Sequence, residues 1–102
     1  MGYESVLLKL SGEALSASGD AILDRGAIDT IAAQIRDVTS TGVRLAVVVG
    51  AGNILRGRDV TDVVETQATA DQMGMLATMI NGLALMDGLE RAGQPARVMS
   101  AV

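Results

Sequence analysis

The stretch Arg44–Asn53, RLAVVVGAGN, runs from an apolar segment of strand-forming residues straight into a loop of small residues. A second stretch of the same kind, Tyr3–Gly12, YESVLLKLSG, lies near the N-terminus. Short apolar runs that end at turn-forming residues are typical of the buried strands of a parallel sheet. The sequence therefore predicts strands over Tyr3–Leu10 and Arg44–Val49, each followed by a small-residue loop.

Between these strands the sequence predicts a loop over Glu13–Leu23 and then an amphipathic helix over Arg25–Ser40. Asp24 can cap the helix N-terminus, and Gly42 can end it. A strand–helix–strand unit has a right-handed crossover and parallel strands, so both loops should lie at one edge of the sheet. The apolar positions that share one face of this helix are Ile28, Ile31, Ala32, Ile35 and Val38.

A longer helix is predicted over Thr66–Ala92, because glycine and proline follow it closely. Its middle, Met73–Met86, is apolar on every side. A helix of this kind is buried on two sides, so we expect one face to meet the sheet and the other a second subunit or further chain. Arg58–Glu65 is predicted to form a mobile segment over the site, and Arg97–Val102 to begin a third strand.

Composition excludes several classes of function. The chain has 102 residues and a net charge of -4, without a cluster of basic residues, so nucleic acid is not an expected partner. It contains neither cysteine nor histidine, which excludes disulfides and the commonest metal ligands. No run approaches the ~20 apolar residues of a membrane span, and no signal peptide precedes the first strand. We expect a soluble cytoplasmic protein that does not bind membranes.

A terminal strand without a following element leaves an unprotected sheet edge. We therefore also expect this chain to be the N-terminal part of a longer protein.

The candidate site lies where the two predicted strands end. Open α/β sheets bind ligands outside the carboxyl ends of their strands. Lys9 precedes the turn Ser11–Gly12, and Gly50–Asn53 offers backbone N–H groups; Arg56 follows shortly after. A lysine and free N–H groups are what a polyphosphate requires. The structural alternative is a solvated lysine at a strand end beside an ordinary tight turn.

Four motifs strengthen the phosphate interpretation. KLSGEAL (9–15), VVVGAGNILRG (47–57), ADQMGMLAT (70–78) and RVMSAV (97–102) resemble the N-terminal segment of the bacterial uridylate (UMP) kinases, a branch of the amino-acid-kinase superfamily. The resemblance implies a three-layer αβα fold with a parallel sheet, of which this chain supplies a β-α-β-α-β portion. Residues 1–102 would form the UMP-binding side of that domain, without its C-terminal ATP-binding portion.

The resemblance also implies an activity and a set of site residues. The activity is transfer of a phosphoryl group from ATP, with Mg²⁺ bound to the nucleotide rather than to this segment, onto UMP to give UDP in pyrimidine nucleotide biosynthesis. Lys9 and Arg56 match the residues that act on the transferred phosphate. The implied ATP contacts are Lys9, Leu10, Ser11, Gly12, Gly52 and Arg56. The implied UMP contacts are Gly50, Ala51, Arg56 and Asp71.

The resemblance further implies a hexamer regulated by GTP and UTP, with self-association through the helix around Met73–Met86. The sequence departs from the family pattern at Ala51, usually glycine, at Thr66–Ala70, which usually carries an Arg and a Gly, and at Met86 and Glu90, where some members contact GTP. Two other functions stay open. One is a non-catalytic nucleotide-binding, anion-binding or storage-type assembly module of the same fold. The other is a kinase that acts on an acyl or carbamoyl substrate.

Overall fold

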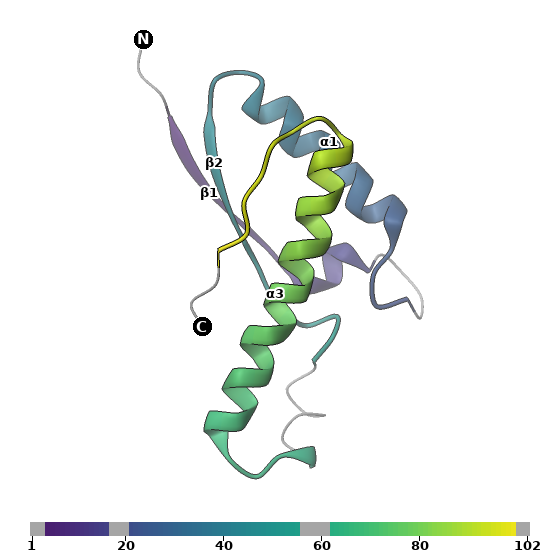
Figure 1. The fold of residues 1–102 in the computed structure, drawn as a ribbon, viewed down its shortest axis with the longest axis vertical. Helices are drawn as coiled ribbons and strands as arrows, with labels where there is room; N and C mark the ends of the chain where they lie inside the picture. The colour runs from purple at the N-terminus through teal and green to yellow at the C-terminus, as the bar shows by residue number, and fades with distance from the viewer. Residues whose placement is uncertain (1–3, 17–20, 56–61, 100–102) are drawn as a thin grey trace.

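The computed structural model describes residues 4–16, 21–55 and 62–99, and its chain path is shown in Figure 1. The elements in chain order are strand β1 (Ser5–Leu10), the 3-10 helix η1 (Gly12–Leu15), helix α1 (Arg25–Thr39), strand β2 (Arg44–Val49) and helix α3 (Gln67–Arg91). The molecule measures 51 × 29 × 16 Å along its principal axes. Its length arises from α3, whose C-terminal half crosses α1 while its N-terminal half extends past the ends of the strands (Figure 1).

The predicted parallel pair of strands is confirmed. β1 and β2 run in the same direction, with Lys9 opposite Val48 at the carboxyl end of the sheet. Alternate strand residues, such as Leu8 and Val47, pack against the helices and belong to the core. The other face of the sheet is open, and the Leu7 side chain there is 63% exposed. The start of the first predicted strand, at Tyr3, lies outside the described residues.

Helix α1 forms where the sequence predicts it, and Asp24 caps it. The Asp24 carboxylate accepts a hydrogen bond from the N–H of Ala27 at 2.8 Å, as expected of an N-cap. Past the other end, Gly42 has φ +94° and turns the chain toward β2. Val38 was predicted to share the apolar face of this helix, but its side chain is 44% exposed. It follows Ile28 by ten residues, which at 3.6 residues per turn places it about 80° away around the helix, at the margin of the face.

The predicted loop over Glu13–Leu23 is wrong for its first residues. Gly12–Leu15 forms one turn of 3-10 helix, and the Leu15 side chain is fully buried. The carbonyl of Leu15 accepts the N–H of Asp24 at 2.7 Å, which joins this turn to the start of α1. The burial of Leu15 could not be predicted from the sequence, because a single buried side chain among small residues produces no periodic pattern.

The apolar helix α3 carries three different stripes along its length. A buried stripe packs chiefly on α1 and to a lesser extent on the sheet; it consists of Ala77, Asn81, Leu85, Gly88 and Leu89. An exposed stripe, which consists of Leu76, Ile80 and Leu83, is 46–55% accessible to solvent. Between them, Met75, Met79, Gly82 and Met86 face a cavity. The helix ends in a Schellman motif, because Gly93 has φ +85° and the N–H of Gln94 reaches the carbonyl of Leu89 at 2.8 Å.

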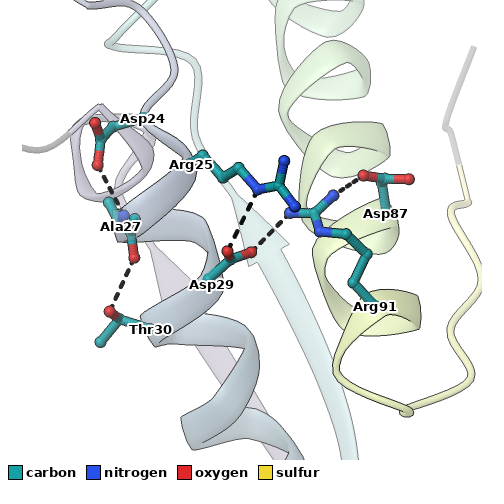
Figure 2. A network of polar contacts seen from close by, with 8 residues as sticks. Asp24, Arg25, Ala27, Asp29, Thr30, Asp87 and Arg91 are labelled. Atoms are coloured by element: carbon teal, nitrogen blue, oxygen red, sulfur yellow. Dashed lines mark hydrogen bonds and ion pairs between the residues drawn. The ribbon is translucent and has the colours of Figure 1, made fainter.

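A charged network on the surface joins α1 to α3 (Figure 2). Asp29 of α1 lies between Arg25 of its own helix and Arg91 of α3, and the Arg91 Nη2 to Asp29 Oδ1 distance is 2.7 Å. Arg91 also pairs with Asp87 one turn earlier. The hydrogen bond from Arg91 lowers the pKa of Asp29 below its ordinary value of 3.8. Because these groups are exposed to solvent, the network contributes little to stability.

The predicted third strand is not formed within the described part of the chain. Arg97–Met99 has no strand structure, and Ser100–Val102 lies outside the described residues. The segment runs back along α3, where a Cβ on Gly82 would stand 3.4 Å from Val98 Cγ1. A cavity of about 650 Å³, bordered by β2, α3 and residues 94–99, separates it from the open edge of β2. The expected third strand over Arg97–Val102 is thus absent from Arg97–Met99, which lies beside α3 instead. Within the ranges given above, no helix is long and apolar enough to cross a membrane.

Gly88 lies at a close contact between α3 and α1, and this contact generates a stability prediction. A Cβ at this position would stand 2.6 Å from Ile28 Cγ2, and a β-branched side chain has little freedom to move away. Gly88→Ala should therefore destabilise the chain by about 1–3 kcal/mol through overpacking. Urea denaturation measures this change in the free energy of unfolding.

Gly74→Ala on the same helix is the matched control, because nothing lies within 4 Å of a Cβ at Gly74. There the better helix propensity of alanine should stabilise the chain by up to about 1 kcal/mol. Equal and stabilising effects of both substitutions would contradict the close contact at Gly88.

Candidate functional site

The two loops that follow β1 and β2 touch each other at the carboxyl edge of the sheet. The N–H of Gly50 donates to the carbonyl of Leu10 at 2.9 Å. A Cβ on Gly12 would stand 2.8 Å from the Gly52 nitrogen and 2.9 Å from the Gly50 oxygen. Both distances are too short for a real side chain, so only glycine fits at position 12. The prediction that the two loops share one edge is confirmed.

The backbone of these loops presents hydrogen-bond donors. Within the described part of the chain, the N–H groups of Gly12, Ala51, Gly52 and Asn53 donate to no acceptor. Adjacent free N–H groups of this kind form the concave sites that bind anions. The loop that the sequence predicts to bind phosphate therefore presents free backbone donors.

Lys9 lies one residue before the end of β1, on the open face of the sheet. Its side chain is exposed, and none of the described acidic residues forms an ion pair with it. Leu10, the next residue, turns toward the core and is half-buried. A free ammonium group at this edge can neutralise an anion that binds beside the loops.

Glu13 occupies the mouth of the site, which sequence reasoning did not anticipate. A Cβ on Gly52 would collide with the Glu13 carboxylate, because it would stand only 2.9 Å from Glu13 Cδ. The carboxylate thus lies directly over the backbone of the second loop. Because like charges repel, this carboxylate and a phosphate could not occupy the same position.

Two asparagine side chains, Asn81 and Asn53, fix the second loop through hydrogen bonds. Asn81 of α3 is fully buried, and its Nδ2 donates to the carbonyl of Gly50 and to Asn53 Oδ1, both at 2.7 Å. Asn53 Nδ2 donates in return to Asn81 Oδ1 at 3.0 Å and to the carbonyl of Ile22 at 2.9 Å. Sequence reasoning gave Asn81 no role. The available signal was an amide side chain in the middle of the apolar run MINGLALM, since buried polar groups need partners.

One predicted site residue, Asp71, is not brought to these loops by the described structure, and a second, Arg56, is not among the described residues. Asp71 lies in the N-terminal part of α3, where Gln67 Nε2 donates to its carboxylate at 2.8 Å. It precedes Asn81 by ten residues, which corresponds to about 15 Å along the helix. Arg56 lies outside the described residues, as do residues 58–61 of the predicted mobile segment.

Comparison with known proteins agrees with this arrangement. The model of the Amino acid kinase family matches residues 4–102. The chain also superimposes on the crystal structure of UMP kinase from Ureaplasma parvum with a TM-score of 0.84 and 35% identity, covering 91% of this chain and 39% of that one. For UMP kinase from Bacillus anthracis the TM-score is 0.80 and the identity 33%, covering 86% and 36%. The chain thus spans less than two fifths of either structure. The family match over nearly the whole chain shows that this protein belongs to the amino acid kinase family.

Proposed function

We propose that this chain forms the phosphate-handling portion of a UMP kinase, which converts ATP and UMP to ADP and UDP in pyrimidine nucleotide biosynthesis. The observation that carries the proposal is the contact of the two loops at Gly12, with free N–H groups on both. The similarity to two UMP kinases, at 33% and 35% identity, supports UMP as the acceptor.

The residues would act by position and charge. Phosphoryl transfer requires little covalent chemistry from the protein and depends on alignment of the phosphates and on neutralisation of the charge that develops. Lys9 and Arg56 would supply positive charge at the transferred phosphoryl group. The N–H groups of Gly12 and Gly52 would act as fixed donors to its oxygens. An oxygen of the UMP phosphate would be the nucleophile.

The two nucleotides would bind on different sides of the loop contact. ATP would contact Leu10 and Ser11 in addition to the charged residues, and UMP would contact Gly50, Ala51 and Asp71. Among the described residues, the acidic side chains form no group of three that could hold a metal ion. As the resemblance to the UMP kinases implies, the proposal places Mg²⁺ on the phosphates of ATP, where it would neutralise their charge.

A kinase assay separates this function from its alternatives. The longest form of the protein that contains this chain would be assayed with ATP and UMP, with other nucleoside monophosphates, and with acyl and carbamoyl acceptors. Selective turnover of UMP is the expected result. Nucleotide binding without turnover would favour the non-catalytic module, and turnover of an acyl or carbamoyl acceptor would favour the other kinase.

We also propose that the protein is a homo-oligomer in which α3 packs on its counterpart. Leu76, Ile80 and Leu83 form a continuous exposed stripe, four and three residues apart. Side chains at this spacing lie on one face of a helix. An apolar stripe of this kind on the surface is typical of a protein–protein contact, and an identical stripe on a second copy would complement it.

Lys9→Ala tests the charge at the transferred phosphate. We expect kcat to fall on the order of 10²-fold or more while KM for UMP changes little, because the lost charge acts on the transition state. Arg44→Ala is the control, since Arg44 is an exposed cation at the opposite end of the sheet. A near-normal kcat for the Lys9 variant would refute its assigned role.

Asp71→Ala tests the proposed contact to UMP. Loss of one hydrogen bond to a charged group costs ~1.5–3 kcal/mol, so KM for UMP should rise roughly tenfold to a hundredfold while KM for ATP stays unchanged. Gln67→Ala is the matched control, because it removes the partner of Asp71 in α3 but leaves the carboxylate in place. An equal rise of both KM values would instead indicate a structural role for Asp71.

Ile80→Lys combined with Leu83→Lys tests the self-association. Lysine is a good helix former, so α3 should persist while the exposed stripe becomes charged. Sedimentation velocity should show a dimer or larger species for the wild type and a shift toward monomer for the double variant. Val63→Lys is the control, because Val63 is 77% exposed but lies outside α3. A wild-type chain that stays monomeric at high concentration would contradict the proposal.

A further inference from the structure

We propose that Asn81 is a positioning residue for the two loops that follow β1 and β2, which we call the phosphate loops and which contain Ser11–Gly12 and Gly50–Asn53. Its buried amide ends the hydrogen-bond ladder between the strands and thereby leaves backbone N–H groups free for a phosphate. The inference rests on the proposed function in one respect, namely that the ligand of these loops carries phosphate groups.

The ladder between β1 and β2 shows where Asn81 intervenes. It begins where the N–H of Arg44 donates to the carbonyl of Glu4 at 2.8 Å and reaches the carbonyl of Leu10, which accepts the N–H of Gly50 at 2.9 Å. In a parallel ladder the bonds are evenly spaced and alternate in direction along each strand. The next bond would therefore run from the N–H of Gly12 to the carbonyl of Gly50.

Asn81 takes the place of that next bond. The carbonyl of Gly50 accepts Asn81 Nδ2 at 2.7 Å, and the N–H of Gly12 has no acceptor among the residues described. The two strands remain close at this point, because a Cβ on Gly12 would stand 2.9 Å from the Gly50 oxygen. Asn81 thus satisfies the carbonyl without separating the loops, and the N–H of Gly12 stays available.

Acceptors at the start of the second loop are occupied as well. The carbonyl of Ala51 accepts the N–H groups of Ile54 and Leu55 at 3.0 and 2.8 Å. The side chain of Asn53 is bound on both of its polar atoms, chiefly by Asn81. Carbonyl oxygens would repel a phosphate, whereas those of Gly50 and Ala51 are already bonded. The first two carbonyls of the loop are therefore occupied, while the N–H groups of Ala51, Gly52 and Asn53 donate to no acceptor among the described residues.

A binding experiment with inorganic pyrophosphate tests the inference. The isotope-labelled 102-residue chain would be titrated with pyrophosphate while the amide NMR signals of Gly12, Ala51 and Gly52 are followed. In the wild type these signals should shift. Asn81→Leu replaces the amide with an apolar side chain of similar size in the helix interface. Pyrophosphate should bind to this variant at least about tenfold more weakly, a change of about 1.4 kcal/mol.

Leu85→Ala is the matched control. Leu85 lies one turn further along the buried stripe of α3, and it takes no part in the hydrogen bonds of Asn81 and Asn53. Its truncation should lower stability but leave pyrophosphate affinity at the wild-type value. Asn53→Ala breaks the same pair from the loop side and should weaken binding as Asn81→Leu does; it decides the question if Asn81→Leu does not fold.

Each outcome has a defined meaning. Wild-type affinity in Asn81→Leu, or in Asn53→Ala where that variant decides, overturns the inference. An equal loss in Leu85→Ala also overturns it, because the effect would then reflect general stability. Absence of loop shifts in the wild type overturns it as well. If the pyrophosphate results hold but the longest form of the protein does not phosphorylate UMP, the proposed reaction fails while the role of Asn81 stands.

Discussion

The backbones of two loops meet at Gly12 with no room for a side chain, and the site depends on this contact. A Cβ there would stand 2.8 Å from the Gly52 nitrogen, closer than real Cβ contacts allow. The contact requires parallel strands that end at the same edge of the sheet, which the register from Ser5 opposite Arg44 to Leu10 opposite Val49 provides. A shift of register by one residue would turn the core-facing side chains outward and would also separate the loops. The apolar alternation of the strands and the geometry of the site are therefore consequences of the same register.

The core beneath the sheet is built from aliphatic side chains and close helix contacts. Tyr3 is the only aromatic residue of the chain, so α1 and α3 approach each other through small residues. Ala32 and Gly88 lie at this crossing, where a Cβ on Gly88 would be 3.7 Å from the Ala32 Cβ. This close crossing brings the buried stripe of α3, including Asn81, to the end of the sheet. Helix packing at one end of α3 thus determines where the Asn81 amide meets the loop.

Local sequence signals predicted the elements and the edge where the loops meet. The cap at Asp24, the bounds of β2 and the glycine after α3 depend on neighbouring residues, and all three were predicted correctly. The features that were missed depend on distant residues. Leu15 is buried because two helices close over it, and Arg97–Met99 stays away from β2 because it lies along α3. The partners of Asn81 and the position of Glu13 over Gly52 likewise arise from tertiary contacts, which a periodic pattern does not encode.

The hydrogen bonds of Asn81 make the shape of the second loop depend on the docking of α3. Asn81 and Gly50 are 31 residues apart, and Asn53 and Ile22 are also 31 residues apart. Closing such intervals costs chain entropy that only the packed helices repay. The second loop takes the shape described here only with α3 docked, because the side chain that binds the Gly50 carbonyl belongs to α3. A chain with α3 undocked would keep the two strands but lose the amide that fixes the loop after β2.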